Sequence, residues 1–439
     1  IIFSDKLVIN QEIKKKNNKL FNDWKLNILN ENCGLKKINK KLNLKNILIN
    51  SKEIKKNDIF FGLKGKSNDG SKFADEAIKK GAAFCIVNSN KNKNTKKIKV
   101  SNPLKTLTEA ASKLREVTNS TIISITGSSG KTSLKDLLAF AFSKLTPTSY
   151  SKYSYNNKYG VPLSLFNIKK KHKFSLLEVG MDKKGEIDKL TGIIKPDLGI
   201  ITNISYAHIK NFNNLNQIAK AKAEIMNNII PNGKILLNAD DNYFNFLKKI
   251  AKRRNLKVIS FGINNRLSNI KLLKIKKNLF KIKLVVGINN AKKNFIINQD
   301  LEPYLINILA SITVLSQFFD LNHINQNIFS NFKIPNARGN LFKINSNKKS
   351  IIVTDESYNS NPLSLNFAIR NFDNIKTKRK KILILSDMLE LGKFSKKLHI
   401  DSARYINKTK INKVYVYGKY VKDTFRNLVQ NKKGKIFKN

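Results

Sequence analysis

The chain has 439 residues, 41% of them hydrophobic, and its 84 Lys and Arg against 30 Asp and Glu give a formal net charge of +54 at pH 7. This length predicts two to four domains, and the apolar content excludes a wholly disordered chain. No apolar run approaches the roughly 18 residues that a bilayer span needs, and the first residues do not form a signal peptide, so we expect a cytoplasmic protein without a membrane span.

The positive charge is spread over the whole sequence, together with many Asn and Ile residues. This distribution favours a solvated basic surface over a nucleic-acid footprint, which would gather Lys and Arg on one face. We therefore expect no nucleic-acid partner, although a basic field attracts a polyanionic substrate such as a nucleotide sugar. The two cysteines, Cys33 and Cys85, are too few for a disulfide framework or a zinc site.

Composition and periodicity divide the chain into four parts. Residues 1–45 are rich in Lys and Asn without clear periodicity, which predicts a tail or linker. Short strands and a helix over residues 46–102 predict a small α/β domain. Strands alternate with helices over residues 103–333, which is typical of βαβ units and a mostly parallel sheet. The pattern restarts over residues 334–439, so the sequence predicts an α/β fold of three domains, the last one Rossmann-like.

The stretch SITGSSGKTSLKD leads from a β-branched strand into a helix through a short loop. Gly127 and Gly130 would let the backbone approach phosphate oxygens, Lys131 supplies a positive charge, and the Thr132 hydroxyl can bind Mg²⁺. The loop is shorter than the standard phosphate loop, which would have Gly where this chain has Ile125. A structural turn that contains Gly-Lys-Thr by chance is the alternative interpretation.

Polar residues follow the later strands of this domain. Glu178 lies at the end of a predicted strand, where a hard oxygen ligand can meet Mg²⁺. His208 lies just past the carboxyl end of another strand, where open α/β sheets place their ligands. Lys220 and Lys222 lie on a predicted helix, and composition alone favours solvated surface lysines for both.

The short loop GSSGKT resembles the ATP-binding loop of the Mur ligases and of folylpolyglutamate synthetase, enzymes that join a carboxylate to an amine with ATP. Four further segments, YNNKYGVPLSL, EVGMDKKGEIDKL, DESYNSNPLSL and SDMLELG, resemble the MurF branch of the Mur ligase family in the same order. The resemblance spans about residues 47–430. It implies an ADP-forming ligase of peptidoglycan precursor synthesis, a monomer that uses ATP and Mg²⁺ to add D-alanyl-D-alanine to UDP-N-acetylmuramoyl-tripeptide.

The resemblance also implies roles for individual residues. The catalytic residues would be Lys131, Glu178, His208 and Lys222. Mg²⁺ would be held by Thr132, Glu178, His208 and Lys222, the last as a carbamate. ATP would contact Gly127, Ser128, Ser129, Gly130, Lys131, Thr132, Ser133, Asn307, Arg338 and Glu356. The substrates would contact Ser51, Asn156, Asn157, Tyr358, Asn359 and Asn361.

The sequence departs from the family pattern at several positions. Glu356 stands where Asp is usual, one methylene longer but able to make the same hydrogen bond. The stretch LEPYLIN before Asn307 lacks the usual Gly and His, which leaves the adenine contacts open. Asn50 and Lys52 replace Asp and Arg, and Lys lacks the bidentate fork of Arg, so the UDP contacts are open too.

The ends of the chain give two further expectations. The Gly-Asp and Lys-Gly-Ser elements of the family's C-terminus do not occur, so we expect a truncated C-terminal domain. Residues 1 to about 16 faintly resemble the closing segment of the preceding ligase of the pathway, which would fit a fused gene.

Besides another Mur-type ligase, the residues leave three alternatives open. A folylpolyglutamate synthetase-like enzyme shares the loop but should lack the small N-terminal domain and the segment SYNSNP. A basic phosphate-loop ATPase acting on nucleic acid would gather its Lys and Arg on one face. A truncated chain that binds ATP without turnover is the third.

Overall fold

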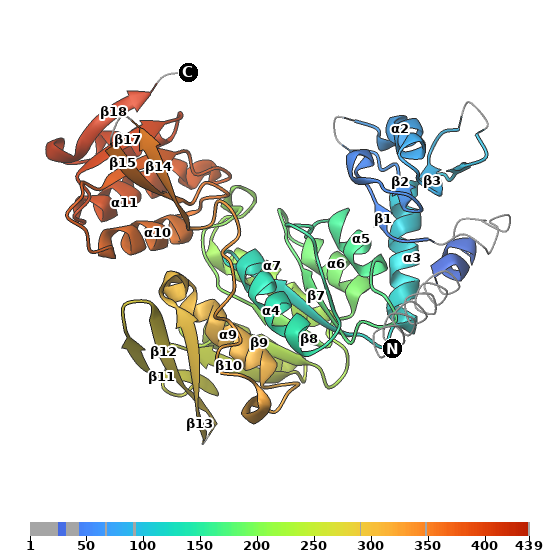
Figure 1. The fold of residues 1–439 in the computed structure, drawn as a ribbon, viewed down its shortest axis with the longest axis horizontal. Helices are drawn as coiled ribbons and strands as arrows, with labels where there is room; N and C mark the ends of the chain where they lie inside the picture. The colour runs from blue at the N-terminus through green and yellow to red at the C-terminus, as the bar shows by residue number, and fades with distance from the viewer. Residues whose placement is uncertain are drawn as a thin grey trace, which may run out of the picture.

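The computed structural model describes residues 25–31, 44–65, 68–90, 94–289, 291–346 and 349–437. Figure 1 shows three lobes, drawn in blue, in green to yellow, and in orange to red. Each lobe contains a sheet of parallel strands with helices, so the expected α/β fold of three domains with mostly parallel sheets is confirmed. No helix within the described ranges is long and apolar enough to cross a membrane.

The N-terminal lobe is built on a four-stranded parallel sheet. Its middle strands are uninterrupted apolar runs, as is usual for parallel strands that are covered on both faces. The sheet order is that of the sequence: β1 (Ile47–Leu48), β2 (Ile59–Phe61), β3 (Phe84–Val87) and β4 (Lys97–Lys99). The helical segments of this lobe are η1 (Ser51–Glu53), η2 (Gly70–Phe73) and α2 (Ala74–Lys79).

The central lobe contains a nine-stranded sheet. Its strands are β5 (Thr121–Thr126), β6 (Thr148–Tyr150), β7 (Phe174–Glu178), β8 (Leu198–Ile201), β9 (Lys234–Asn238), β10 (Lys257–Gly262), β11 (Ile270–Lys277), β12 (Lys281–Ile288) and β13 (Ala291–Asn298). The order is β13-β12-β11-β10-β9-β8-β5-β7-β6, and only the pairs β11–β12 and β12–β13 are antiparallel. β7 and β6 lie on one side of β5, and β8 lies on the other, so the strand order reverses at β5. Such a reversal opens a crevice for ligands at the carboxyl ends of the strands.

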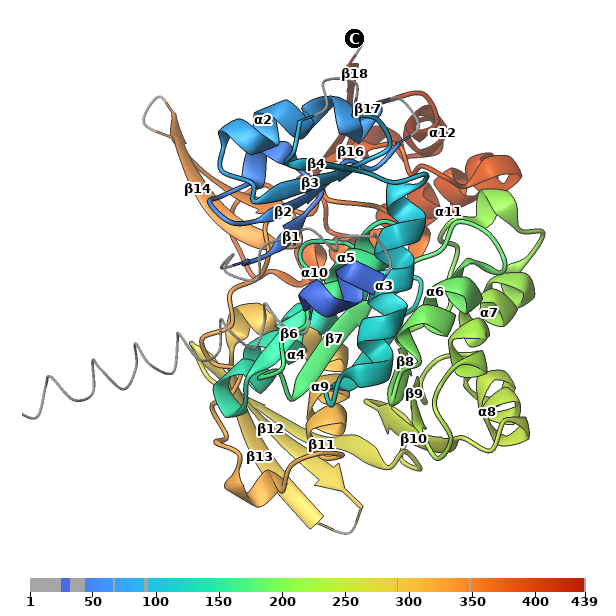
Figure 2. The ribbon, with the colours of Figure 1, turned by 90° about the vertical axis from the view of Figure 1, so that its right-hand side faces the viewer.

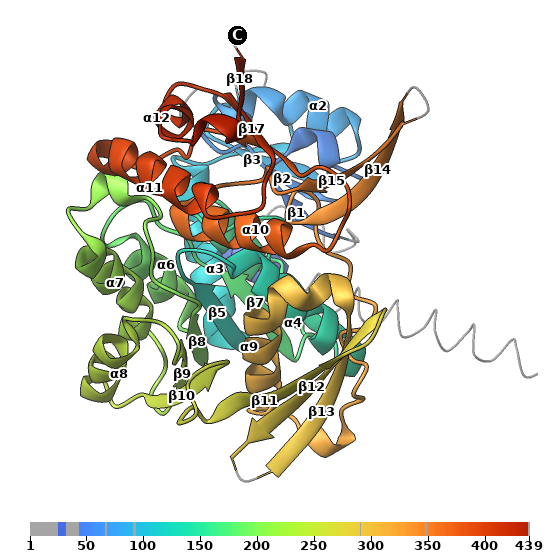
Figure 3. The ribbon, with the colours of Figure 1, turned by 90° about the vertical axis from the view of Figure 1, so that its left-hand side faces the viewer.

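Successive residues of a strand point to opposite faces of the sheet, and the central strands are apolar on both faces. Helices therefore cover both faces of the central sheet. Ile122 of β5 belongs to one apolar cluster, whereas Ile123 and Ile125 belong to the other. Figure 2 shows the face with α5 (Gly160–Phe166), α6 (Glu186–Ile194), α7 (Leu215–Ala223) and α8 (Phe244–Arg253). Figure 3 shows the opposite face with α4 (Lys131–Leu145) and α9 (Leu305–Leu315). Short helical turns are η3 (Ile209–Asn211), η4 (Glu224–Asn227), η5 (Gln299–Tyr304) and η6 (Leu321–His323).

Helix α3 (Pro103–Val117) connects the first two lobes. It begins with Pro103 after Asn102, whose Oδ1 accepts hydrogen bonds from two backbone N–H groups of the first turn, at 3.0 and 3.1 Å. The helix packs against β2 as well as against α5 and α6, so it belongs to the core of both lobes.

Residues 25–31 form a helix inside the segment for which the sequence predicted a tail or linker. Leu26, Ile28 and Leu29 are buried in the same apolar cluster as α3 and α5, and the Lys25 ammonium donates to the carbonyl of Phe166. The prediction therefore does not hold for this helix, which is part of the core. The rest of that segment, residues 1–24 and 32–43, lies outside the described residues, as does the resemblance proposed for residues 1–16.

The C-terminal lobe combines a parallel sheet with a separate antiparallel hairpin. The sheet consists of β16 (Ile382–Ser386), β17 (Lys413–Tyr417) and β18 (Lys433–Phe437), and the hairpin of β14 (Asn340–Ser346) and β15 (Lys349–Asp355). The helical segments are α10 (Pro362–Asn374), η7 (Gly392–Phe394), α11 (Ser395–Asn407), α12 (Val421–Arg426) and η8 (Gln430–Lys432).

Candidate active site

The loop between β5 and α4 has the geometry of an anion-binding turn. Gly127 and Gly130 have φ values of 145° and 79°, a region that favours glycine. A Cβ at Gly127 would lie 1.9 Å from the Thr202 hydroxyl oxygen, so no side chain fits there. Gly130 precedes the first turn of α4, and no side chain caps the N–H groups of that turn. These groups, at the positive end of the helix dipole, are the donors that a phosphate would accept from.

The end of β8 holds the loop in this conformation. The backbone N–H of Ser128 donates to the Asn203 carbonyl at 3.0 Å, and that of Ser129 donates to Asn203 Oδ1 at 2.9 Å. The Thr202 hydroxyl donates to the Ser129 carbonyl at 2.6 Å. The sequence analysis did not single out Asn203, although its place directly after a parallel strand is the signal by which we selected Glu178 and His208.

Two lysines, the buried Lys222 and the partly buried Lys131, converge on the carbonyl of Gly127. Lys131 Nζ donates to it at 2.8 Å and Lys222 Nζ at 3.0 Å. Lys222 is only 1% exposed, whereas Lys220 on the same helix is exposed, so the structure separates two lysines that the sequence could not. Burial, and then the neighbouring Lys131, hold the pKa of Lys222 well below its ordinary value. Two ammonium groups so close together are unfavourable away from water, and a bound phosphate would stabilise their charged forms.

Glu178 at the end of β7 is the centre of a second polar group. Its side chain is 1% exposed, and it accepts hydrogen bonds from Thr132 Oγ1 at 2.8 Å and from Asn156 Nδ2 at 2.7 Å. A hydroxyl and a carboxylate oxygen in contact are donors that suit a hard cation such as Mg²⁺. Asn157 does not join this group, because its Oδ1 accepts from the N–H groups of Tyr159 and Gly160 at the start of α5.

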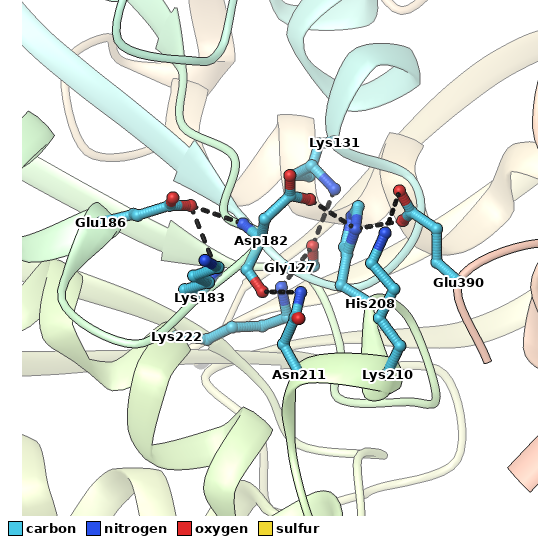
Figure 4. A network of polar contacts seen from close by, with 10 residues as sticks. All are labelled: Gly127, Lys131, Asp182, Lys183, Glu186, His208, Lys210, Asn211, Lys222 and Glu390. Carbon is cyan, nitrogen blue, oxygen red and sulfur yellow. Dashed lines mark hydrogen bonds and ion pairs between the residues drawn. The ribbon is translucent and has the colours of Figure 1, made fainter. Parts of the chain in front are cut away.

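His208 lies in a third polar group, shown in Figure 4. Its Nδ1 lies 3.1 Å from Asp182 Oδ1 and also contacts Glu390 Oε2 of the C-terminal lobe. One ligand atom from each of these three residues lies within 4.8 Å of the others. Burial lowers the pKa of His208, Glu390 opposes this effect, and Lys222 and Lys131 reinforce it.

The predicted metal ligands Glu178 and His208 are therefore members of different groups. Within the described ranges, no hydrogen bond or ion pair joins them, but Lys131 interacts electrostatically with both. The sequence analysis missed Asp182 and Glu390 as site residues, although both occur in the segments that it quoted.

Of the residues predicted to bind the nucleotide, Asn307 lies at the start of α4, Arg338 interacts electrostatically with Lys131 there, and Glu356 interacts with Arg338. Asn307 Nδ2 is 3.5 Å from the Gly130 carbonyl, and a Cβ at Gly130 would approach the Asn307 amide to 3.3 Å. The Arg338 guanidinium stacks over the Tyr358 ring at 3.9 Å from its centroid. Although Glu356 as a residue is exposed, desolvation of its carboxyl group, and then Asp355, raise its pKa to about 7, and Arg338 opposes the shift.

Two of the predicted substrate residues connect the C-terminal lobe to the phosphate loop. Asn361 Oδ1 accepts from two backbone N–H groups at the start of α10, and its Nδ2 donates to Ser129 Oγ at 2.8 Å. The Tyr358 hydroxyl contacts Ser154 Oγ, which lies 3.5 Å from Thr132 Oγ1. Asn361 therefore contacts the loop directly, whereas Tyr358 reaches Thr132 at the start of α4 through Ser154.

The two remaining predicted substrate residues do not reach the loop by hydrogen bonds. Asn359 is exposed, and its side chain makes no hydrogen bond to the described residues. Ser51 lies in η1 of the N-terminal lobe, where its hydroxyl donates to Glu76 Oε2 at 2.9 Å.

Comparison with known proteins finds Mur ligases that are similar to most of the chain. The model of the Mur ligase family catalytic domain matches residues 43–121, and that of the Mur ligase middle domain matches residues 125–315. The UDP-N-acetylmuramoyl-tripeptide--D-alanyl-D-alanine ligase of Rickettsia prowazekii is 30% identical over 419 residues, which are 95% of this chain and 92% of that protein. The enzyme of the same name from Buchnera aphidicola is 31% identical over 91% of this chain and 85% of its own.

Solved structures share the fold. A crystal structure of MurF from Acinetobacter baumannii superposes with a TM-score of 0.79 at 23% identity, over 93% of this chain and 88% of that one. The MurF ligase of Thermotoga maritima, solved in complex with ADP, gives a TM-score of 0.74 at 23% identity, over 90% of this chain and 89% of that one. With both family models and near full-length relatives in agreement, the chain belongs to the Mur ligase family, and within it to the MurF type.

Proposed function

We propose that the chain uses ATP to add D-alanyl-D-alanine to UDP-N-acetylmuramoyl-tripeptide in peptidoglycan precursor synthesis. The names of relatives that match most of its length support this reaction. The observation that carries it is the phosphate loop, where the N–H groups at the start of α4 have no side-chain cap and Lys131 and Lys222 both donate to the Gly127 carbonyl. Because the substrates include ATP and a nucleotide-linked sugar, we propose that the enzyme acts in the cytoplasm. We also expect it to act as a monomer.

The reaction requires a carboxylate to become a good acceptor for an amine. An oxygen of the tripeptide's terminal carboxylate attacks the γ-phosphorus, and the bond to the β-phosphate oxygen breaks, which gives an acyl phosphate and ADP. The dipeptide amine then attacks the acyl carbon, and phosphate leaves as the amide forms. The chain's part is alignment and charge neutralisation, for which Lys131 and the N–H groups at the start of α4 are placed.

Mg²⁺ fits the oxygen donors around the loop. When bound, it would neutralise charge on the transferring phosphoryl group. Thr132 and Glu178 would hold it through a hydroxyl and a carboxylate oxygen, the donors that this ion prefers, and His208 would add a ring nitrogen. Lys222 would add a carbamate oxygen. Burial favours the neutral amine of Lys222, which is the form that reacts with carbon dioxide, and the product places an anion near the Lys131 ammonium.

The other predicted residues divide between the substrates. Asn307 at the start of α4, together with Arg338 and the neighbouring Glu356, would contact the nucleotide. Tyr358, Asn359 and Asn361 belong to the C-terminal lobe and would lie near the dipeptide. In the central lobe, Asn156 and Asn157 would contact the substrate, as Ser51 would in the N-terminal lobe.

Mass spectrometry of the ligated product tests this function. The chain is incubated with ATP, Mg²⁺, D-alanyl-D-alanine and UDP-N-acetylmuramoyl-tripeptide in its lysine and diaminopimelate forms. We expect a pentapeptide product and equimolar ADP, and neither when the dipeptide is replaced by D-alanine or when a folate and glutamate are supplied. The Lys131→Ala variant is the matched negative control. A chain that binds ADP by calorimetry yet forms no pentapeptide would contradict the proposal.

A further inference from the structure

The segment SDMLELG brings one carboxylate of the C-terminal lobe into the group around His208. Glu390 Oε2 contacts His208 Nδ1, and Glu390 Oε1 lies 3.4 Å from Lys210 Nζ. Of the residues in Figure 4, Glu390 alone comes from the C-terminal lobe. This segment marked the resemblance to the family, but none of the roles described above uses Glu390.

The segment that carries Glu390 is fixed within its own lobe. Asp387 accepts hydrogen bonds from three successive backbone N–H groups at the start of α12, at 2.7 to 2.9 Å. The backbone N–H of Met388 donates to Nε2 of the buried His399 at 3.2 Å, and Leu391 is buried. Because the residues on both sides are held, Glu390 has little freedom to move independently of the lobe.

The backbone at this contact is in an unfavourable conformation on both sides. Glu390 has a φ of 62° and His208 a φ of 57°, in the left-handed region that residues with a Cβ rarely adopt. Such a conformation costs on the order of 1 kcal/mol or more and persists where surrounding contacts impose it, which is frequent at active sites. The two residues that meet across the lobes are thus both held in strained positions.

The contact also joins the two lobes through the backbone. The N–H of Lys210 donates to the Glu390 carbonyl at 3.0 Å. A Cβ at Gly392 would lie 2.9 Å from Lys210 Cα, so the two backbones approach as closely as glycine allows. Glu390 therefore contacts the central lobe with its carbonyl and both carboxylate oxygens, and these contacts exist only when the lobes are docked.

The two carboxylates at His208 differ in origin. Asp182 follows β7 in the central lobe, as His208 follows β8, so their contact does not depend on lobe docking. Glu390 arrives from the other lobe. A histidine that binds a metal usually donates its other ring N–H to a carboxylate, which fixes the tautomer and the ring orientation. Carboxylates at Nδ1 leave Nε2 for a ligand in the site.

We propose that Glu390 is a positioning residue for the ligation: it holds the imidazole of His208 at Nδ1 when the C-terminal lobe is docked, so that the His208 ring is fixed only in the docked arrangement. This inference rests on the proposed function. The simpler role for Glu390 is an ion pair with Lys210 that only strengthens docking. In the first role Glu390 affects kcat through His208, and in the second it affects lobe docking through Lys210.

Steady-state kinetics of matched variants separates these roles. In Glu390→Ala we expect kcat to fall about 10–100-fold, as for other residues that orient a ligand, with the KM for ATP within about twofold. Lys210→Ala removes the ion pair but leaves His208 untouched, so its kcat should stay within about twofold. In Glu390→Gln, the amide oxygen can accept from Nδ1–H at the same place, and most of the activity should return.

A double-variant cycle and a spectroscopic measurement complete the test. Glu390→Ala combined with His208→Gln should lose no more kcat than His208→Gln alone. The chain has four histidines, so the ring nitrogen resonances of ¹⁵N-histidine-labelled protein are few, and the spectrum of His208→Gln identifies those of His208. The Nδ1 resonance should shift in Glu390→Ala and stay in place in Lys210→Ala.

Equal losses of kcat in Lys210→Ala and Glu390→Ala, additive losses in the double variant, or an unchanged His208 resonance in Glu390→Ala would each overturn the proposal. Thermal melting and ADP binding confirm that each variant is folded. If the parent chain forms no pentapeptide, the proposed function fails, but the resonance comparison still decides whether Glu390 positions the ring.

Discussion

The phosphate loop and the junction with the C-terminal lobe meet at one site but are held by different contacts. The loop is fixed within the central lobe by buried groups at the ends of neighbouring strands, Asn203 among them. The junction depends on side chains such as Asn361, which lies 232 residues along the chain from its partner Ser129, and Tyr358, which is 52% exposed. The loop is thus complete in any lobe arrangement, whereas the junction forms only on docking.

The largest effect is expected in the loop, from Lys131→Ala. This variant removes the ammonium group that lies at the start of α4, and phosphoryl transfer depends on such charge neutralisation. We expect kcat to fall about 10²–10³-fold, about 3–4 kcal/mol of transition-state stabilisation, with the melting temperature kept. Pentapeptide formation followed by mass spectrometry measures it. A loss below about fivefold would place the chemistry outside this loop.

Lys222→Met compared with Lys220→Met probes the second lysine of the loop. We expect about a 10²-fold loss of kcat for the buried Lys222, and less than a twofold change for the exposed Lys220. Intact mass spectrometry in bicarbonate buffer should show one added carbon dioxide on the parent and on Lys220→Met, but not on Lys222→Met. Equal adduct formation on both variants would remove the carbamate from the mechanism.

At the junction, Asn361→Ser separates two functions of one side chain. Serine can still cap α10, but it is too short to reach Ser129 as Asn361 Nδ2 does. Since a single hydrogen bond contributes about 1 kcal/mol, we expect kcat/KM for the dipeptide to fall about fivefold with stability unchanged. Ser129→Ala should reproduce this loss, and the double variant should add nothing to it. Additive losses would show that the two residues act separately.

The smallest effect concerns Glu356 and pH. The pKa of Glu356 is raised from 4.5 to about 7, so the folded protein binds this proton more tightly than the unfolded chain. The resulting stability is present below pH 4.5 and is lost as the pH rises through about 7. Glu356→Gln, which stays neutral, should match the parent at pH 5 and melt about 1–2 °C higher at pH 8. A difference that is the same at both pH values would contradict the shift.

The sequence predicted the parts of the site that depend on local order. Thr132 and Glu178 were identified from a loop and a strand end, and they lie in contact because neighbouring parallel strands end at the same edge. Local pattern could not separate Lys222 from Lys220, because burial depends on what packs against the helix.

Contacts between distant segments could not be predicted in the same way. The helix over residues 25–31 is short and is flanked in the sequence by polar residues. Its Lys25 contacts Phe166, which lies 141 positions away in the sequence. Glu390 contacts His208 with its own backbone in the left-handed region, a conformation that the sequence of its segment does not predict. Such contacts are consequences of tertiary packing.

The two edge strands of the central sheet, β6 and β13, are the places where a second copy of the chain could pair with this sheet. β6 has only three residues, too few to template a long pairing. On the opposite side, the N–H of Ile296 in β13 donates to the Gln326 carbonyl at 2.8 Å, and its carbonyl accepts from the Ser330 hydroxyl at 3.1 Å. Beside these occupied groups lies the exposed Lys292. An occupied backbone at Ile296 and an exposed lysine on the same strand disfavour edge-to-edge pairing with a second copy.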